Sequence, residues 1–174
     1  MNKVLIVVDL QNDFITGPLG TKEAVAIVPK IDNYIDECLN QKEGFFEIIF
    51  TKDIHSKNFY KYTIEGQYIP EHCINETDGQ KIVNNLNNHF GFKTIHKHTF
   101  TYTKWDEWFS VIVPDIIEIV GLCTDICVIS NALVLRSVFP NARIIVHSDM
   151  CAGTTPEKHI AALEVMKSCL IEVI

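Results

Sequence analysis

The sequence predicts an α/β protein with three layers, in which a mostly parallel central sheet lies between helices. The first observation is a series of short apolar runs rich in β-branched residues, typical of strands covered on both faces. The second is that helical patterns separate these runs, and this alternation favours a parallel sheet. The third is a length of 174 residues, which suits one domain, expected over residues 1–174.

Five clear apolar runs and one weaker run, KTIHK, are the predicted strands. They cover residues 3–10, 45–53, 93–97, 115–122, 142–149 and 170–174. Helical patterns cover residues 22–41, 78–90, 125–139 and 156–169. Pro29 interrupts the first helical pattern, and we place it near the start of a helix because proline disrupts a helix interior.

Charge and hydropathy exclude several classes of function. A net charge of −7 without any basic run argues against binding to nucleic acid or to an anionic membrane surface. No apolar stretch is long enough to span a bilayer. The first apolar run ends at Asp9, which makes it too short for a secretory signal. We therefore expect a cytoplasmic protein whose six cysteines are reduced thiols.

Chemically reactive side chains follow four of the predicted strands. The residues at those carboxyl ends are Asp9, Asp53, His55, Lys97, Cys123 and Cys127. Parallel α/β sheets bind their ligands beyond the carboxyl ends of the strands. We therefore expect carboxylates, an imidazole, an ammonium and thiols to share one rim of the sheet.

The sequence VGLCTDICVISNAL places a cysteine in the first turn of a predicted helix, with Thr124 as a candidate N-cap. A helix N-terminus and a nearby cation both stabilise a thiolate. Cys127 is therefore a candidate nucleophile with a pKa below that of an ordinary thiol, Lys97 its cation and Asp9 its general base. A buried structural cysteine and a redox pair with Cys123 are the alternatives.

A second group of side chains has the composition of a metal site. Asp53 and His55 are two residues apart and point the same way on an extended segment. The loop YTIEGQYIPEHC adds Glu65 and His72, while the side chain of Cys73 would point away. This set suits Zn²⁺, Mn²⁺ or Fe²⁺ and could keep a coordination position open. The alternative is that these are ordinary loop residues.

Taken in order, these segments resemble the isochorismatase-like cysteine hydrolases, and within them most closely the nicotinamidases. The matching segments, found along residues 4–128, are VVDLQNDF, TKDIH, PEHC, IHKHTF and GLCTDICV. VVDLQNDF together with TDICV is specific for the superfamily. The metal residues narrow the resemblance to nicotinamidases, because many relatives without that activity lack them.

The resemblance implies a catalytic triad of Asp9, Lys97 and Cys127. It also implies a cis peptide bond between Leu122 and Cys123 and an oxyanion hole made by the backbone N–H groups of Cys123 and Cys127. Asp125 is left with a role in local structure only. The reaction implied is hydrolysis of nicotinamide to nicotinate and ammonia through a cysteine thioester, in NAD salvage.

The metal implied by the resemblance is a divalent ion, zinc first and Mn²⁺ or Fe²⁺ as alternatives, which would hold the pyridine nitrogen. Glu65 stands where many nicotinamidases carry a histidine and some carry a glutamate. Phe14, Leu19 and Phe100 are the expected walls around a flat ring. The partner implied is a small-molecule amide, and the superfamily suggests a homo-oligomer. The alternatives are a relative acting on another small amide without a metal, and a non-catalytic α/β binding module.

Overall fold

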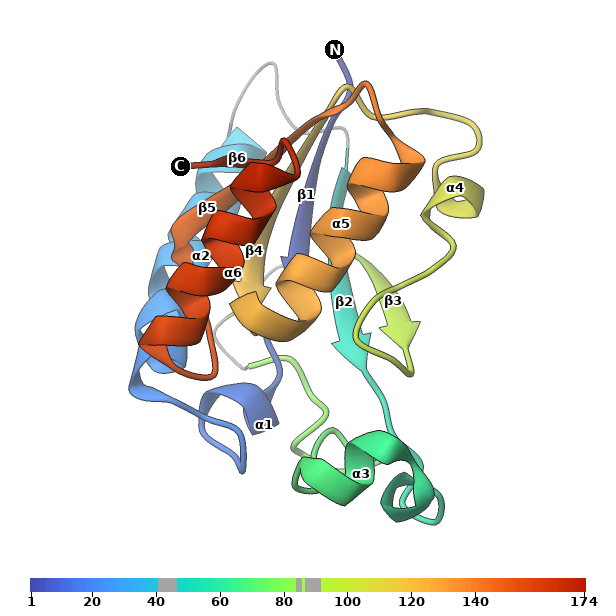
Figure 1. Ribbon diagram of the computed structural model, residues 1–174, viewed down its shortest axis with the longest axis vertical. Helices are drawn as coiled ribbons and strands as arrows, with labels where there is room; N and C mark the ends of the chain where they lie inside the picture. Colours follow the sequence, from blue (N-terminus) through green and yellow to red (C-terminus); the bar gives the residue numbers. More distant parts are fainter. Residues whose placement is uncertain (41–46, 84–85, 87–91) are drawn as a thin grey trace.

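The computed structural model describes residues 1–40, 47–83, 86 and 92–174. Six strands form one sheet in the order β3-β2-β1-β4-β5-β6 (Figure 1). The strands are β1 (Lys3–Val8), β2 (Glu47–Asp53), β3 (Lys93–Lys97), β4 (Ile116–Leu122), β5 (Arg143–Ala152) and β6 (Glu172–Val173). Every neighbouring pair is parallel, so the predicted α/β class is confirmed and the sheet is parallel throughout.

Helices cover both faces of the sheet. They are α1 (Asn12–Ile15), α2 (Lys22–Asn40), α3 (Ile64–Tyr68), α4 (Trp105–Trp108), α5 (Ile129–Val138) and α6 (Pro156–Ser168), with a 3₁₀ turn η1 (Tyr60–Tyr62) and a π-helical turn η3 (Thr124–Val128). In Figure 1, α5 and α6 lie in front of the sheet and α2 lies behind it. The predicted three-layer architecture is therefore confirmed. Among the described residues, no helix combines the length and apolar character needed to cross a bilayer.

Strand β1 lies inside the sheet and contributes to a hydrophobic core on each face. Leu5 and Val7 pack with the buried residues of α2. Val4, Ile6 and Val8 pack with those of α5 and α6 on the other face. All five side chains are fully buried, which explains why the run KVLIVV shows no alternation of apolar and polar residues.

Two sequence-based expectations about helices are wrong. Pro29 lies inside α2 rather than near its start. The residue is exposed, so water can satisfy the carbonyl that its missing N–H leaves free, and the apolar face of α2 holds the helix on the sheet.

The second wrong expectation is the helix over residues 78–90. The described residues 78–83 form turns and a β-bridge, because their carbonyls accept hydrogen bonds from the N-terminal segment, as from the Asn12 amide to the Lys81 carbonyl at 2.9 Å. The other residues of that predicted helix, apart from Leu86, lie outside the described residues, as do Gln41, Phe45 and Phe46.

The carboxyl ends of β1 to β4 meet at the edge where α1 and α3 lie (Figure 1). Gly121 of β4 has a φ of +119°, and a Cβ atom there would lie 2.1 Å from the carbonyl oxygen of Val8. Only glycine permits this approach between β4 and β1. The chain segments that follow the two strands, which begin with Asp9 and Cys123, are thereby brought side by side.

A buried polar cluster joins α2 to the other end of the sheet. The carboxylate of Glu118 accepts a hydrogen bond from the Tyr34 hydroxyl and lies 2.7 Å from His147 Nε2. Burial raises the pKa of Glu118, but the hydrogen bonds from His147 and Tyr34 outweigh it, so the pKa lies below its ordinary value of 4.5. A carboxyl whose pKa is lower in the folded state stabilises the fold above its unfolded pKa, and this stabilisation is lost as pH falls through the folded pKa.

We expect Glu118→Gln to lower the free energy of unfolding at pH 7 by about 1–3 kcal/mol, because a charge-assisted acceptor is lost. The difference from the unsubstituted protein should begin to shrink as pH falls below about 4.5, where the carboxyl of the unfolded chain becomes protonated, and should shrink further until pH passes the lower folded pKa. Urea unfolding at a series of pH values measures this. Glu164→Gln, which alters the exposed pair with Lys167, is the matched control. A constant difference across the acidic range would contradict the prediction.

Candidate active site

Asp9, Lys97 and Cys127 meet in the interior at the carboxyl edge of the sheet. The ammonium nitrogen of Lys97 lies 2.7 Å from Asp9 Oδ2 and 3.6 Å from Cys127 Sγ. All three side chains are buried. Asp9 follows β1, Lys97 is the last residue of β3, and Cys127 lies in η3, so only the fold brings the three residues together. The result is a thiol with a cation and a carboxylate beside it, the groups that thiol chemistry requires.

The carboxylate of Asp9 is held in place by strand β2. Thr51 Oγ1 donates to Asp9 Oδ1 at 2.7 Å, and the Asp9 amide donates to the Thr51 carbonyl at 3.2 Å. Burial raises the pKa of Asp9, and the nearby Lys97 only partly opposes this. A carboxylate with a raised pKa is a better acceptor for a thiol proton. Sequence reasoning did not identify Thr51, whose position inside a buried strand gave no signal.

The pKa of the Cys127 thiol is shifted in the direction opposite to the sequence-based expectation. Burial raises the pKa of Cys127 well above the usual value, and the opposing effect of Lys97 is smaller. Burial lowers the pKa of Lys97, but its interactions with Asp9, Cys127 and Asp53 outweigh this and leave the pKa raised. The Lys97 charge is therefore shared with two carboxylates, and burial opposes ionisation of the Cys127 thiol.

The turn that carries Cys127 is wound as a π-helix. The carbonyl of Cys123 accepts hydrogen bonds from the amides of Ile126 and Val128, both at 3.0 Å. The structure records no bond from the intervening Cys127 amide to that carbonyl. The Leu122–Cys123 peptide bond is cis, as the family resemblance implies. The hydrogen bonding of this turn thus departs from that of a regular α-helix just before Cys127.

The assignment of Thr124 as an N-cap is wrong, because Cys123 is the N-cap residue of this turn. Thr124 is buried, and its hydroxyl lies 2.8 Å from His159 Nδ1. The neighbouring Asp125 accepts hydrogen bonds from the amide and the hydroxyl of Thr154, at 2.7 and 2.6 Å. These contacts join the turn that carries Cys127 to α6 and to the loop before it, and they agree with a structural role for Asp125.

Asp53, His55, Glu65 and His72 converge beside Lys97, and their ligand atoms all lie within 4.8 Å of one another. Asp53 Oδ2 lies 3.1 Å from His55 Nε2 and 3.6 Å from His72 Nε2. Glu65 Oε1 lies 3.7 and 3.5 Å from the same two nitrogens. Ligand atoms about 2.0–2.1 Å from a tetrahedral zinc ion are about 3.3 Å apart. The donor types and their spacing therefore fit a divalent metal.

Neighbouring groups orient two of these candidate ligands. His72 Nδ1 lies 2.8 Å from the Pro70 carbonyl, which can only accept, so Nδ1 carries a proton and Nε2 is the ring nitrogen that faces the cluster. The Tyr60 hydroxyl lies 3.2 Å from the same Nδ1. The Gln11 side chain binds the backbone of Asp53 twice, at 2.7 and 2.8 Å. Neither Gln11 nor Tyr60 was identified from the sequence.

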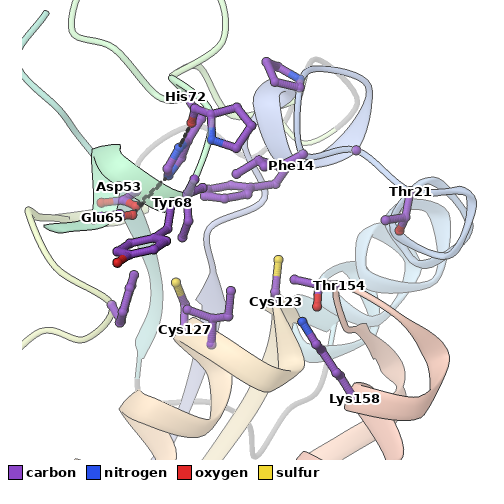
Figure 2. Close-up of a pocket in the computed structure, with 17 residues that line it drawn as sticks. Phe14, Thr21, Asp53, Glu65, Tyr68, His72, Cys123, Cys127, Thr154 and Lys158 are labelled. Atoms are coloured by element: carbon purple, nitrogen blue, oxygen red, sulfur yellow. Dashed lines mark hydrogen bonds and ion pairs between the residues drawn. The ribbon is translucent and has the colours of Figure 1, made fainter. Parts of the chain in front are cut away.

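A cavity of about 440 Å³ opens beside the two cysteines (Figure 2). Its lining residues are Phe14, Pro18, Leu19, Gly20, Thr21, Asp53, Glu65, Tyr68, Ile69, Pro70, His72, Phe100, Cys123, Ile126, Cys127, Thr154 and Lys158. Figure 2 shows Cys123 and Cys127 entering it from one turn, with the metal-site residues at the opposite wall. Phe14, Leu19 and Phe100 all line the cavity, and their contact with a substrate stays a prediction.

Asn131 is a further residue that sequence reasoning missed. It is fully buried in α5, and its Nδ2 donates to the Cys127 carbonyl at 2.8 Å. Its Oδ1 accepts hydrogen bonds from Trp105 Nε1 and the Tyr102 amide, both at 3.2 Å. Asn131 therefore links the turn that carries Cys127 to the segment after β3. The available signal was a polar residue four positions after Cys127 on an apolar helix.

Comparison with known proteins agrees with this geometry. The family model described as the isochorismatase domain matches residues 3–174. The nicotinamidase/pyrazinamidase of Mycobacterium tuberculosis is 26% identical over 188 residues, covering 99% of this chain and 98% of that protein. The crystal structure of the pyrazinamidase of Pyrococcus horikoshii in complex with zinc is similar, with a TM-score of 0.86 and 28% identity, covering 100% of this chain and 99% of that chain. An isochorismatase-like hydrolase from Alkaliphilus metalliredigens, at 21% identity, shares the fold with a TM-score of 0.86, covering 99% of this chain and 94% of that one. The chain belongs to the isochorismatase-like hydrolase family.

Proposed function

We propose that this protein is a metal-dependent nicotinamidase, which hydrolyses nicotinamide to nicotinate and ammonia. The observation that carries the proposal is that one cavity is lined by the buried Cys127 and by Asp53, Glu65 and His72, three of the four residues of the metal set. The thiol site alone would support hydrolysis of many small amides. The metal set, together with full-length nicotinamidase relatives at about 26% identity, supports an amide whose ring offers a nitrogen donor.

In the first half of the reaction, Asp9 takes the proton of the Cys127 thiol and the sulfur attacks the amide carbon. Lys97 stabilises the negative charge on sulfur as it develops. The backbone N–H groups of Cys123 and Cys127 hold the oxyanion. When the C–N bond breaks, Asp9 returns its proton to the departing nitrogen, so ammonia leaves and a thioester remains.

In the second half, a water molecule takes the place of ammonia beside Asp9. Asp9 accepts a proton from this water as the oxygen attacks the thioester carbon. The same two backbone N–H groups stabilise the second oxyanion. The C–S bond then breaks, nicotinate is released, and the proton on Asp9 returns to the sulfur of Cys127.

Asp53, His55, Glu65 and His72 would hold the metal, with zinc as the first choice and Mn²⁺ or Fe²⁺ as alternatives. When bound, the metal supplies a Lewis acid for the ring nitrogen and so orients the amide toward the nucleophile. Phe14, Leu19 and Phe100 would enclose the flat ring. The physiological role that goes with this activity is salvage of nicotinamide for NAD synthesis. A cytoplasmic location and a homo-oligomeric assembly stay predictions.

Replacing Cys127 with alanine should lower kcat for ammonia release from nicotinamide by at least about a thousandfold, because no thioester can form. Zinc content should stay the same, since Cys127 is not in the metal set. Cys169→Ala, at the half-buried end of α6, is the control. Substantial activity of Cys127→Ala would refute the thioester mechanism. If the zinc-loaded protein releases no ammonia from nicotinamide, the substrate is another small amide.

Removing a metal ligand should weaken zinc binding without altering the thiol site. We expect His72→Ala and Glu65→Gln each to reduce zinc affinity by at least about 10–100-fold, measured by competition with a chromogenic chelator. His98→Ala is the control. His98 is exposed and lies outside the metal set, and its Nδ1 is 2.8 Å from the Ile54 carbonyl oxygen. Wild-type zinc affinity in His72→Ala would show that these four residues do not form the site.

A further inference from the structure

The end of the cavity away from the metal set carries a cation. Lys158 of α6 lines the cavity with Thr21, Thr154 and Cys123. In Figure 2 its side chain extends from α6 toward Cys123, on the side of the cavity opposite His72. Among the described lining residues it is the only lysine or arginine. The cavity therefore has a metal-binding end and a cationic end, with the nucleophile between them.

The position of Lys158 within α6 is unfavourable for a lysine. Thr155 is the N-cap of this helix, and its hydroxyl accepts a hydrogen bond from the Lys158 amide at 3.3 Å. The residue at this position of a capping box is usually Glu or Gln, and the positive end of the helix dipole disfavours an ammonium group there. The described part of the chain offers no carboxylate in an ion pair with Lys158. Lys158 is exposed, so its ammonium group is accessible to a ligand that enters the cavity.

The polar neighbours of Lys158 at this end of the cavity already have partners. Thr154 Oγ1 donates to Asp125 Oδ2 at 2.6 Å, and the other oxygen of Asp125 accepts from the Thr154 amide. Thr21 Oγ1 accepts a hydrogen bond from the Ala24 amide at 3.0 Å. The ammonium group of Lys158 and the O–H of Thr21 are thus the donors at this end that can bind a ligand, and only Lys158 carries a charge.

The loop that precedes Lys158 is fixed relative to the nucleophile. Thr154 is bound to Asp125, and His159 is bound to Thr124, in both cases by side chains of the turn that carries Cys127. Gly153 packs closely as well, since a Cβ atom there would lie 2.9 Å from Asp125 Oδ1. The base of the Lys158 side chain therefore keeps a constant position relative to the reacting sulfur.

We propose that Lys158 is a specificity-determining residue that selects amides bearing an anionic group, such as a ring carboxylate, on the part of the ring remote from the metal-bound atom. This inference rests on the proposed amidase function and names the substrate class of that site. A cavity of about 440 Å³ lies in the range that accommodates drug-sized ligands. It therefore has room for a substituent beyond a single six-membered ring.

The test compares nicotinamide with 5-carboxynicotinamide as substrates of the zinc-loaded protein. Lys158→Met should lower the ratio of kcat/KM for the carboxylated amide to that for nicotinamide about fivefold, mainly through KM, as expected for one partly exposed ion pair. The ratio in the unsubstituted protein should also fall with added salt. Lys167→Met, on the same helix and paired with Glu164, is the control and should leave the ratio unchanged.

An unchanged ratio in Lys158→Met would overturn the proposal and leave the amidase function intact. If the zinc-loaded protein hydrolyses neither amide, the proposed function fails, and binding measurements test Lys158 separately. Calorimetry would compare pyridine-3,5-dicarboxylate with nicotinate as ligands of Cys127→Ala and of Cys127→Ala with Lys158→Met. Lys158→Met should weaken binding of the dicarboxylate at least about threefold more than binding of nicotinate, and equal weakening would overturn the proposal.

Discussion

The buried ammonium group of Lys97 is the interaction on which the rest of the site depends. A buried charge is costly unless it is paired, and Lys97 lies 2.7 Å from Asp9 and 3.7 Å from Asp53. One cation therefore stabilises two buried carboxylates that would otherwise repel each other. Because Asp53 also faces the imidazoles of the metal set, the thiol site and the metal site share one electrostatic centre.

The strand order explains how this centre forms. Strands β3, β2, β1 and β4 are neighbours in the sheet, and each contributes one group at or just beyond its carboxyl end. From β1 the chain passes to β2 and β3 on one side of the sheet and then returns to β4 on the other side of β1. The strand order therefore reverses between β1 and β4, and parallel sheets bind ligands at such a topological switch point. Gly121 permits the close approach of β4 to β1. Asp9 and Cys127, which are 118 positions apart in the sequence, are thereby placed beside the same Lys97 ammonium group.

The surrounding side chains act on this centre mainly by holding its backbone. Gln11 fixes the strand end at Asp53, and Asn131 fixes the carbonyl of Cys127. Both are buried amides, which can donate and accept at the same time and carry no charge that would compete with Lys97. Site geometry therefore depends on neutral hydrogen bonds around a small number of charges.

The sequence by itself determined the α/β class, the candidate triad and the candidate metal set, because strand ends of a parallel sheet meet and the chemistry of each residue type is local information. The tertiary structure alone decided that burial raises the pKa of the Cys127 thiol, that Pro29 lies within a helix, and that Lys158 reaches the cavity. It also decided that Thr124 binds His159 instead of capping its own turn. These properties depend on burial and on contacts between distant segments, and a sequence pattern read along the chain contains neither.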